Sequence, residues 1–320
     1  MPDLKNKITA PQLFCLVFCY ILAGFRLHGG ASVAATLFVC LFCACVCVVC
    51  AAAHESCGSF AALCRSVFGT YGYVLRAPCA VLLALPFLAS LWELAKGAAN
   101  FYENGQAFAV LPVLVILCVM AQLRGFSTLG RFAELCVFPL AILLPLSLLG
   151  GGGETPSFAL GQEDLPACFA AVGAVPVFFS LYLRHAKTDE QSDFARASSF
   201  RPAPALCGVL AVFAAGLVHI FLVFTGAGSV LSSFLMWFPA LGRLFAFSLS
   251  IGDVLALPES GRAVCAKKIA VFAALCAAVW ALSVLFPWFF GAALAVCNVV
   301  FPCVVFAAVI LGQSYGRRKA

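Results

Sequence analysis

Long apolar runs separated by short polar connections make up most of the chain. A helix needs about 20 mainly apolar residues to cross the ~30 Å hydrocarbon core of a bilayer. Ten runs of this kind occur, and they cover residues 9–27, 31–53, 77–95, 107–123, 130–149, 167–183, 203–225, 236–257, 268–287 and 290–312. The pattern predicts an all-α integral membrane protein with about ten transmembrane helices.

Composition supports the same setting. Hydrophobic residues make up 64% of the 320 and charged residues 10%, whereas soluble domains contain about half and about a quarter. The net charge of +6 is modest, and no stretch interleaves basic and aromatic residues as a nucleic-acid groove would. The first run follows Lys5 and Lys7, so a cleaved signal peptide is an alternative, with "GASVAA" as its cleavage region. Nine further runs make a retained first helix the simpler interpretation.

The basic residues predict the orientation. With the amino terminus in the cytoplasm, sixteen of the 19 Lys and Arg residues fall in segments expected on that side. Arg26, Lys96 and Arg243 fall on the opposite side. Basic connections remain in the cytoplasm, so both termini are expected there.

The densest cysteine cluster, "CLFCACVCVVC" at 40–50, lies inside the second run. At 100° per residue, Cys40, Cys43, Cys47 and Cys50 share about 80° of arc, and Cys45 points elsewhere. The outermost two are then ~15 Å apart along the axis, so one straight helix cannot gather four thiolates around a metal ion. The pattern predicts neutral thiols that pack against a neighbouring helix.

The ten runs divide into two halves of five. We expect a first repeat at 1–149, an extracytoplasmic linker at 150–166, a second repeat at 167–312 and a basic cytoplasmic tail at 313–320. An odd number of spans per half inverts the second half relative to the first. This is the 5+5 inverted-repeat, LeuT-type arrangement of many secondary transporters, whose site lies near the midplane between broken helices.

Several stretches add a family resemblance. "KITAPQLFCLVF" (7–18) resembles the amino-terminal segment of the spore-germinant receptor B-subunit family (GerAB-like), a branch of the amino acid–polyamine–organocation transporters. "SFAALCRSVFGTYGYVL" (59–75) is similar to that family's cytoplasmic segment after the second span. "RGFSTLGRFAELCVFPLAILLPL" (124–146) is similar to its fifth-span region, and "SIGDVLAL" (250–257) to its eighth.

The resemblance implies a receptor subunit in the inner membrane of the spore, or otherwise in a bacterial cell membrane. Such a subunit would recognise a small nutrient, an amino acid first, and trigger germination together with A and C type partner subunits. The loop at 184–201 would be a candidate partner contact. This chain departs from the family pattern in its short passage between the first two spans and in "PESGRAVCAKK" (258–268).

A solute site is expected where the first and sixth spans break. Pro176 removes a backbone donor, Gly173 allows the chain to unwind, and Gly24 is their counterpart in the first span. Freed backbone groups in such breaks could hold a zwitterion, although a simple proline kink would leave the same pattern. The ligand-binding candidates are Gly24, Phe25, Arg26, Gly173, Ala174 and Pro176. Arg26 could face a ligand carboxylate or, with His28, reach the headgroup region.

Ionisable residues inside spans are further candidates. Glu93 and Asp253 could couple a proton or an ion, but Glu93 could equally pair with Lys96 at helical spacing. Arg131 and Glu134 have the spacing of an ion pair, with a possible gating role. His219, within the seventh span, fits a packing residue better than a proton relay.

The sequence shows no nucleophile–base pair, phosphate loop or metal cluster, so we expect no enzyme, cofactor or metal site. The first interpretation is the nutrient-receptor subunit. The alternatives are a proton-coupled amino acid permease and a membrane scaffold that binds no solute.

Overall fold

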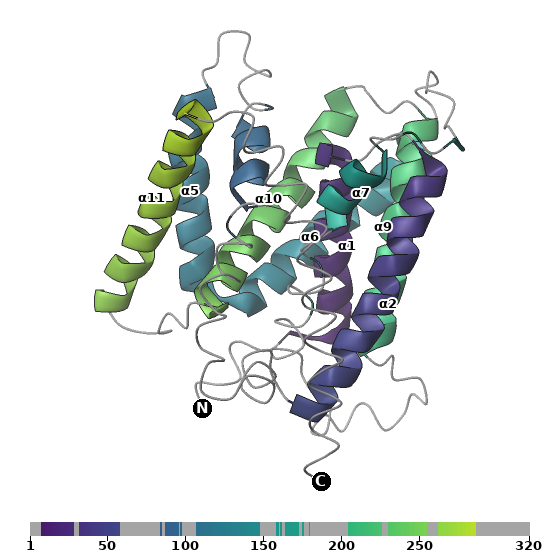
Figure 1. The fold of residues 1–320 in the computed structure, drawn as a ribbon, viewed down its shortest axis with the longest axis horizontal. Helices are drawn as coiled ribbons and strands as arrows, with labels where there is room; N and C mark the ends of the chain where they lie inside the picture. The colour runs from purple at the N-terminus through teal and green to yellow at the C-terminus, as the bar shows by residue number, and fades with distance from the viewer. Residues whose placement is uncertain are drawn as a thin grey trace.

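The predicted apolar runs are helical where the computed structural model describes them (Figure 1). The helices are α1 (Ala10–His28), α2 (Val33–Cys57), α5 (Ala107–Arg124), α6 (Phe126–Ser147), α7 (Asp164–Val172), α9 (Pro204–Phe224), α10 (Val230–Val254) and α11 (Arg262–Leu285). The structure describes residues 8–28, 32–57, 84, 87–95, 97, 107–147, 158–159, 161, 164–172, 175, 179, 204–225, 230–254 and 262–285. The tenth expected run lies outside these residues, so the ten-helix arrangement stays a prediction.

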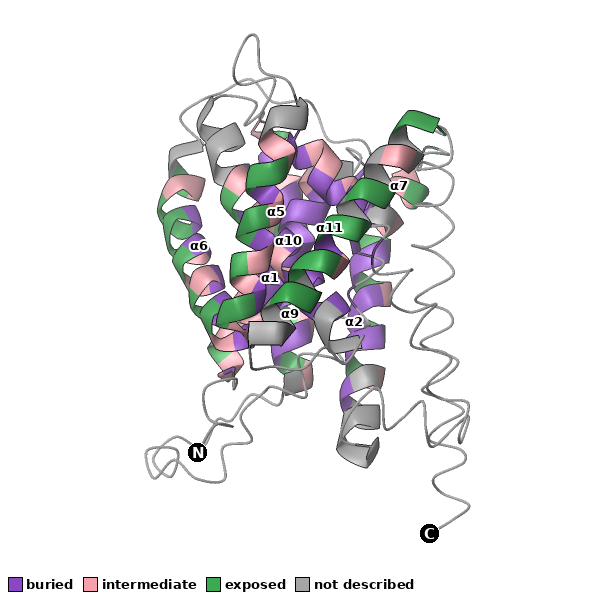
Figure 2. Cartoon of the chain, turned by 90° about the vertical axis from the view of Figure 1, so that its left-hand side faces the viewer, coloured by how far each residue is buried: buried purple, intermediate pink, exposed green. Residues whose placement is uncertain are grey.

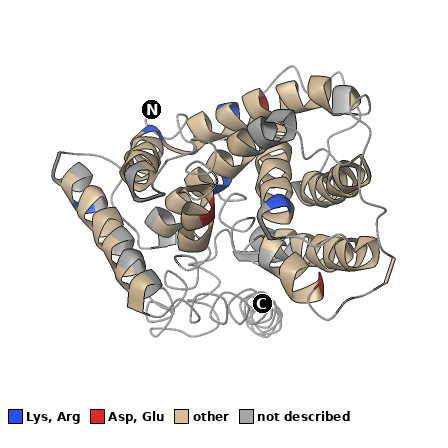
Figure 3. Cartoon of the chain, turned by 90° about the horizontal axis from the view of Figure 1, so that it is seen from above, with Lys and Arg blue, Asp and Glu red and all other residues tan. Residues whose placement is uncertain are grey.

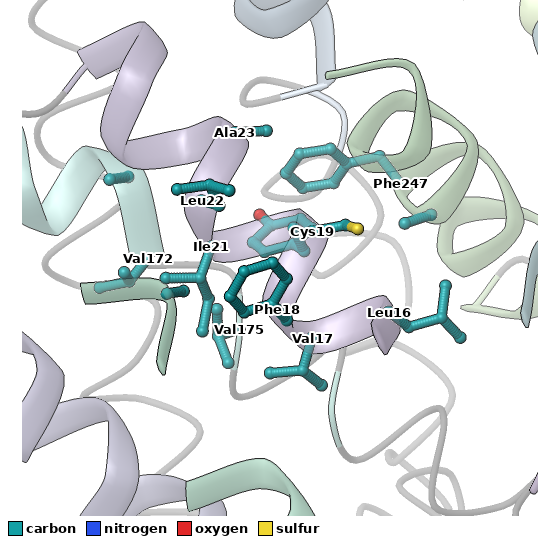
Figure 4. Packing of buried hydrophobic residues seen from close by; sticks show 14 of the residues in the cluster. Leu16, Val17, Phe18, Cys19, Ile21, Leu22, Ala23, Val172, Val175 and Phe247 are labelled. Carbon is teal, nitrogen blue, oxygen red and sulfur yellow. The ribbon is translucent and has the colours of Figure 1, made fainter. Parts of the chain in front are cut away.

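Helix α1 is the centre of the molecule. It packs against α9, α10, α6 and α7, while α2 covers α9 and α7 on one side. Every residue from 16 to 25 is buried, and Figure 4 shows α1 side chains between Val172 and Val175 on one side and Phe247 on the other. An apolar helix that is buried all round belongs to the core of a large helical protein.

The outer helices carry apolar side chains on their outward faces as well. On α6, Leu135, Phe138 and Ile142 are exposed at helical spacing, Phe138 by 70%, and Figure 2 shows exposed residues along the outer surfaces of α6 and α11. Figure 3 shows few charged residues on the helices. Contiguous exposed apolar faces of this kind contact lipid in a membrane protein.

Two described helical segments, Phe126–Pro145 and Ala205–Phe224, are long and apolar enough to cross a bilayer by themselves. Shorter apolar stretches occur at Ala10–Arg26, Val33–Val49, Val110–Arg124 and Trp237–Ile251.

The cysteine prediction is confirmed where the structure describes the side chains. Cys40, Cys43 and Cys47 of α2 are buried free thiols, and Cys45 is exposed. The Cys40 thiol donates to the Val212 carbonyl of α9 at 3.7 Å, and a Cβ added at Gly216 would meet its sulfur at 2.5 Å. Small residues on both helices therefore allow α2 and α9 to approach closely.

The structure explains two residues, Gln12 and Gly125, in the stretches that resemble the receptor family. Gln12 Oε1 accepts from the Thr9 backbone N–H at 3.1 Å, which is half of a capping box at the start of α1. Gly125, between α5 and α6, has a φ of 79°. Its N–H donates to the Ala121 carbonyl at 3.0 Å, which is the αL motif that commonly terminates a right-handed helix.

Candidate functional site

The expected break in the first span is absent, because α1 runs as one helix from Ala10 to His28 through Gly24. In the second half, α7 is described over Asp164–Val172, and Val175 is again helical. Gly173, Ala174 and Pro176 lie outside the described residues, so the structure leaves their predicted role open. The sequence prediction of two broken helices is thus wrong for α1.

The surface of α1 at Gly24 is instead occupied by a side chain from α10. Arg243 is 1% exposed and lies in the middle of α10. Its Nη1 donates to the Ala171 carbonyl at 2.7 Å and to the Tyr20 carbonyl at 3.3 Å. One guanidinium thus joins α10 to α1 and to the last turn of α7.

Gly24 makes this contact possible. In a helix the Tyr20 carbonyl points toward residue 24, four positions later, so a side chain there would cover it. A Cβ at Gly24 would overlap Arg243 Nη1 and the Ala171 carbonyl, whose carbon would be 2.9 Å away. The glycine is required here for close approach of three helices and not for backbone flexibility.

Electrostatics explain why a cation is stable at this depth. Nη1 has two backbone carbonyl oxygens as partners, those of Ala171 in α7 and Tyr20 in α1. The guanidinium carbon is 4.5 Å from the Tyr20 ring centroid and 5.5 Å from that of Phe247. Carbonyl oxygens and aromatic faces both attract a cation, and a buried charge requires such partners.

The sequence analysis missed this role. It assigned Arg243 to the extracytoplasmic side in the charge count, whereas the structure buries it in α10. The signal was present, because the residue falls within the predicted run 236–257, and an ionisable residue inside a span is a functional candidate by default. Removing it from the count leaves two basic residues on that side.

The neighbours of Gly24 on α1 contact other helices. Phe25 is fully buried and stacks on His219 of α9, with ring centroids 5.0 Å apart. This agrees with a packing role for His219. Arg26 is half-buried, and the side chain of His28 lies outside the described set.

The two proton-coupling candidates do not lie in this contact as far as the structure describes them. Glu93 is half-buried in the helical segment at 87–95, and Lys96 is outside the described residues. Asp253 lies in the last turn of α10, ten residues after Arg243, and its side chain is likewise outside them.

Glu134 has a different partner from the one predicted. Gln12 Nε2 of α1 donates to its carboxylate at 3.3 Å, while Arg131 is exposed. Among the described contacts there is no ion pair between Arg131 and Glu134. The physical reason is proximity: Gly130 lacks a side chain, and a Cβ there would lie 3.1 Å from Gln12, so α1 approaches α6 closely enough for Gln12 to reach the carboxylate.

A third polar contact joins α10 to α5. Ser248 Oγ donates to the Cys118 carbonyl at 3.2 Å, and Gln122 Nε2 donates to the Ser248 carbonyl. Both residues are buried. Helix α10 therefore has polar contacts on two sides, to α1 and α7 through Arg243 and to α5 through Ser248.

Comparison with known proteins identifies the class of fold. No family model matches the chain, and no curated protein matches it in sequence. Among solved structures, it is similar to a manganese transporter of Eremococcus coleocola, crystallised in complex with an aromatic bis-isothiourea substituted compound. The match has a TM-score of 0.55 at 12% identity and covers 90% of this chain and 74% of the other. The chain thus has an all-helical, transporter-like fold.

Within that fold, the described polar groups offer a specific chemistry. They place a fixed positive charge where α1, α7 and α10 meet. In the described part of the chain, no three His, Cys, Asp or Glu residues lie together as a metal site would need. A buried guanidinium attracts anionic groups and pairs with carboxylates in a planar, two-pronged geometry.

Proposed function

We propose that this protein is a membrane-embedded recognition subunit that binds a small nutrient carrying a carboxylate, an amino acid first, where α1, α7 and α10 meet. The observation that carries the proposal is the buried Arg243 guanidinium between Gly24 and the end of α7. In a transporter fold, solute sites lie between the repeats near the midplane, and a fixed cation there selects an anionic group.

The same charge argues against a divalent metal as the solute at this position. The structurally similar transporter is a manganese transporter, but at 12% identity the likeness concerns the fold. A metal ion beside Arg243 would meet like-charge repulsion in a medium of low dielectric constant. A carboxylate would meet attraction.

Sequence resemblance supplies the finer proposal of a spore-germinant receptor B-type subunit. Two of the stretches that resemble that family lie against each other, since Gln12 of the first contacts Glu134 of the second. In this role the protein would act with A and C type subunits in the spore inner membrane. The loop at 184–201, outside the described residues, would be a contact for these partners.

The proposed mechanism is a shift between two packings of the helices. A ligand carboxylate is a stronger partner for the guanidinium than the neutral Ala171 carbonyl, because it carries the opposite charge and can accept two parallel N–H bonds. Capture of Arg243 by the ligand would release its bond to α7. The population would move toward a state in which α7 sits differently against α1 and α10, and partner subunits would detect that state.

Thermal unfolding of the purified full-length chain tests the proposal. Each amino acid is compared with its own amide, which keeps the side chain and the amino group but lacks the carboxylate. At ~100 times its dissociation constant, a true ligand stabilises the fold by about 2.7 kcal/mol. We expect one or a few amino acids to raise the Tm and their amides to have no effect. Equal shifts with acid and amide would exclude recognition through the carboxylate.

The second candidate is a permease for the same solutes, favoured by the transporter-like fold. Uptake into proteoliposomes distinguishes the two, because a receptor subunit would bind without flux, and a permease would show flux that depends on Glu93 or Asp253. Absence of any Tm shift in folded protein, together with absence of flux, would favour the scaffold alternative.

A further inference from the structure

The surroundings of Arg243 resemble those of a bound cation. Two carbonyl oxygens from different helices accept from one nitrogen, at 2.7 and 3.3 Å. Two aromatic rings, Tyr20 and Phe247, lie within 5.5 Å of the guanidinium carbon. Backbone carbonyls near the midplane are among the groups with which transporters of this architecture coordinate a coupling cation.

The fit is specific for the guanidinium. Because residue 24 is a glycine, the surface of α1 leaves room for Arg243 Nη1. A Cβ added at this position would overlap that nitrogen. The Tyr20 and Phe247 rings meet edge to face, with centroids 5.2 Å apart, and both lie against the guanidinium. An arginine side chain also keeps its charge at all physiological pH values. The three helices thus hold a cation that cannot dissociate.

We propose that Arg243 is an internal cation, which occupies the place where α1, α7 and α10 would otherwise bind a dissolved monovalent cation. It follows that the contact of α7 with α1 and α10 is independent of Na⁺ and K⁺ in the native protein. Removal of the guanidinium should create a cation site at the same carbonyls. This inference goes beyond the proposed function and requires no nutrient. It can therefore fail while nutrient recognition holds, and nutrient recognition can fail while this inference holds.

Chemical rescue in the full-length protein tests this inference. The thermal unfolding of wild type and Arg243→Ala is followed in detergent with up to about 50 mM guanidinium, Na⁺, K⁺ or choline chloride. This range is far below the molar guanidinium concentrations at which domains unfold. Choline controls for ionic strength, because its quaternary ammonium has no N–H group to donate to the two carbonyls. We expect the wild-type Tm to be the same in all four salts.

For Arg243→Ala we expect a Tm lower by about 5 °C or more, restored saturably by guanidinium and not by choline. Partial recovery with Na⁺ or K⁺ would identify the carbonyl cluster as a general cation site and also supports the inference. Equal responses to guanidinium and choline would overturn it.

A second pair of variants covers the case in which Arg243→Ala does not fold. Arg243→Lys keeps a cation, and Arg243→Met has a comparable volume without charge. An internal cation predicts that the lysine variant retains a higher Tm than the methionine variant. A purely space-filling residue predicts the opposite order, because methionine avoids the cost of burying a charge. This second result would also overturn the inference.

Discussion

Helix α1 has one polar contact at its start and another in its middle, and the two are built on different principles. At the start, Gln12 serves its own helix by accepting from Thr9 and also donates to Glu134 of α6. In the middle, α1 contributes a backbone carbonyl, a glycine and the face of the Tyr20 ring, and the charge comes from Arg243 of α10. The first contact is partly exposed and the second fully buried. The comparison teaches that the stronger constraint on α1 lies where the charge is supplied by another helix.

The largest expected effect comes from closing the middle contact at Gly24. In Gly24→Ala the new methyl group would overlap Arg243 and the Ala171 backbone, which cannot rotate away. Overpacking of a tight site costs 1–3 kcal/mol or more, and we expect about 3 kcal/mol at this position. Equilibrium unfolding in detergent measures it.

The matched control is Gly242→Ala, one residue before Arg243 on α10. A Cβ there would lie 3.7 Å from the Phe132 ring, an ordinary contact. Replacing a helical glycine by alanine is itself favourable by roughly 0.5–1 kcal/mol, so this variant should be as stable as wild type or slightly more so. Similar losses in both variants would show that the middle of α1 is not specially constrained.

The start of α1 should be less sensitive. Gln12→Ala removes the acceptor for the Thr9 N–H and the donor to Glu134. Loss of a helix cap typically costs about 1 kcal/mol, and a partly exposed hydrogen bond adds little. We expect a loss of about 1 to 1.5 kcal/mol in the same unfolding assay. Glu134→Gln, which keeps an acceptor oxygen, should lose less than Gln12→Ala, and the reverse order would place the main contribution in the charge of Glu134.

Whether a feature of this structure could be predicted from the sequence depends on how far apart along the chain the interacting residues lie. The helix positions followed from apolar runs, because the bilayer sets a length that is a local property of the chain. The arrangement of Cys40, Cys43, Cys47 and Cys45 followed from helical periodicity, and the structure confirms which of them are buried. Both inferences use neighbouring residues only.

The contacts of Arg243 could not be predicted in this way. Its acceptors are backbone carbonyls 72 and 223 positions away, and a carbonyl carries no sequence signature. Gly24 was selected as a site residue for conformational freedom, whereas its actual role is to leave room for another side chain. Glu134 was assigned to Arg131 because spacing reveals neighbours on one helix, while its partner Gln12 lies 122 positions away.

A smaller effect is expected at the contact of α10 with α5, which tests whether every buried polar contact of α10 matters as much as Arg243. Ser248→Ala removes the hydroxyl that donates to Cys118 and leaves the backbone carbonyl that accepts from Gln122. Interhelical hydrogen bonds in membranes average about 0.6 kcal/mol, and we expect a loss of that size in unfolding. A loss as large as that of Gly24→Ala would show that α10 depends on polar contacts along its whole length.

The smallest expected effect is at Arg131, where the sequence and the structure make opposite predictions. An ion pair with Glu134 at helical spacing would be worth about 0.3–0.5 kcal/mol, so Arg131→Ala and Glu134→Ala would be coupled. In the structure, Arg131 is exposed and Glu134 accepts from Gln12. We therefore expect Arg131→Ala to change the unfolding free energy by less than about 0.5 kcal/mol. Its effect should add to that of Glu134→Ala with no coupling, whereas Gln12→Ala and Glu134→Ala should be coupled.

Two double-mutant cycles share the Glu134→Ala variant and are measured under the same conditions. Coupling in the cycle with Arg131 but not in the cycle with Gln12 would mean that Gln12 does not fasten the start of α1 to α6.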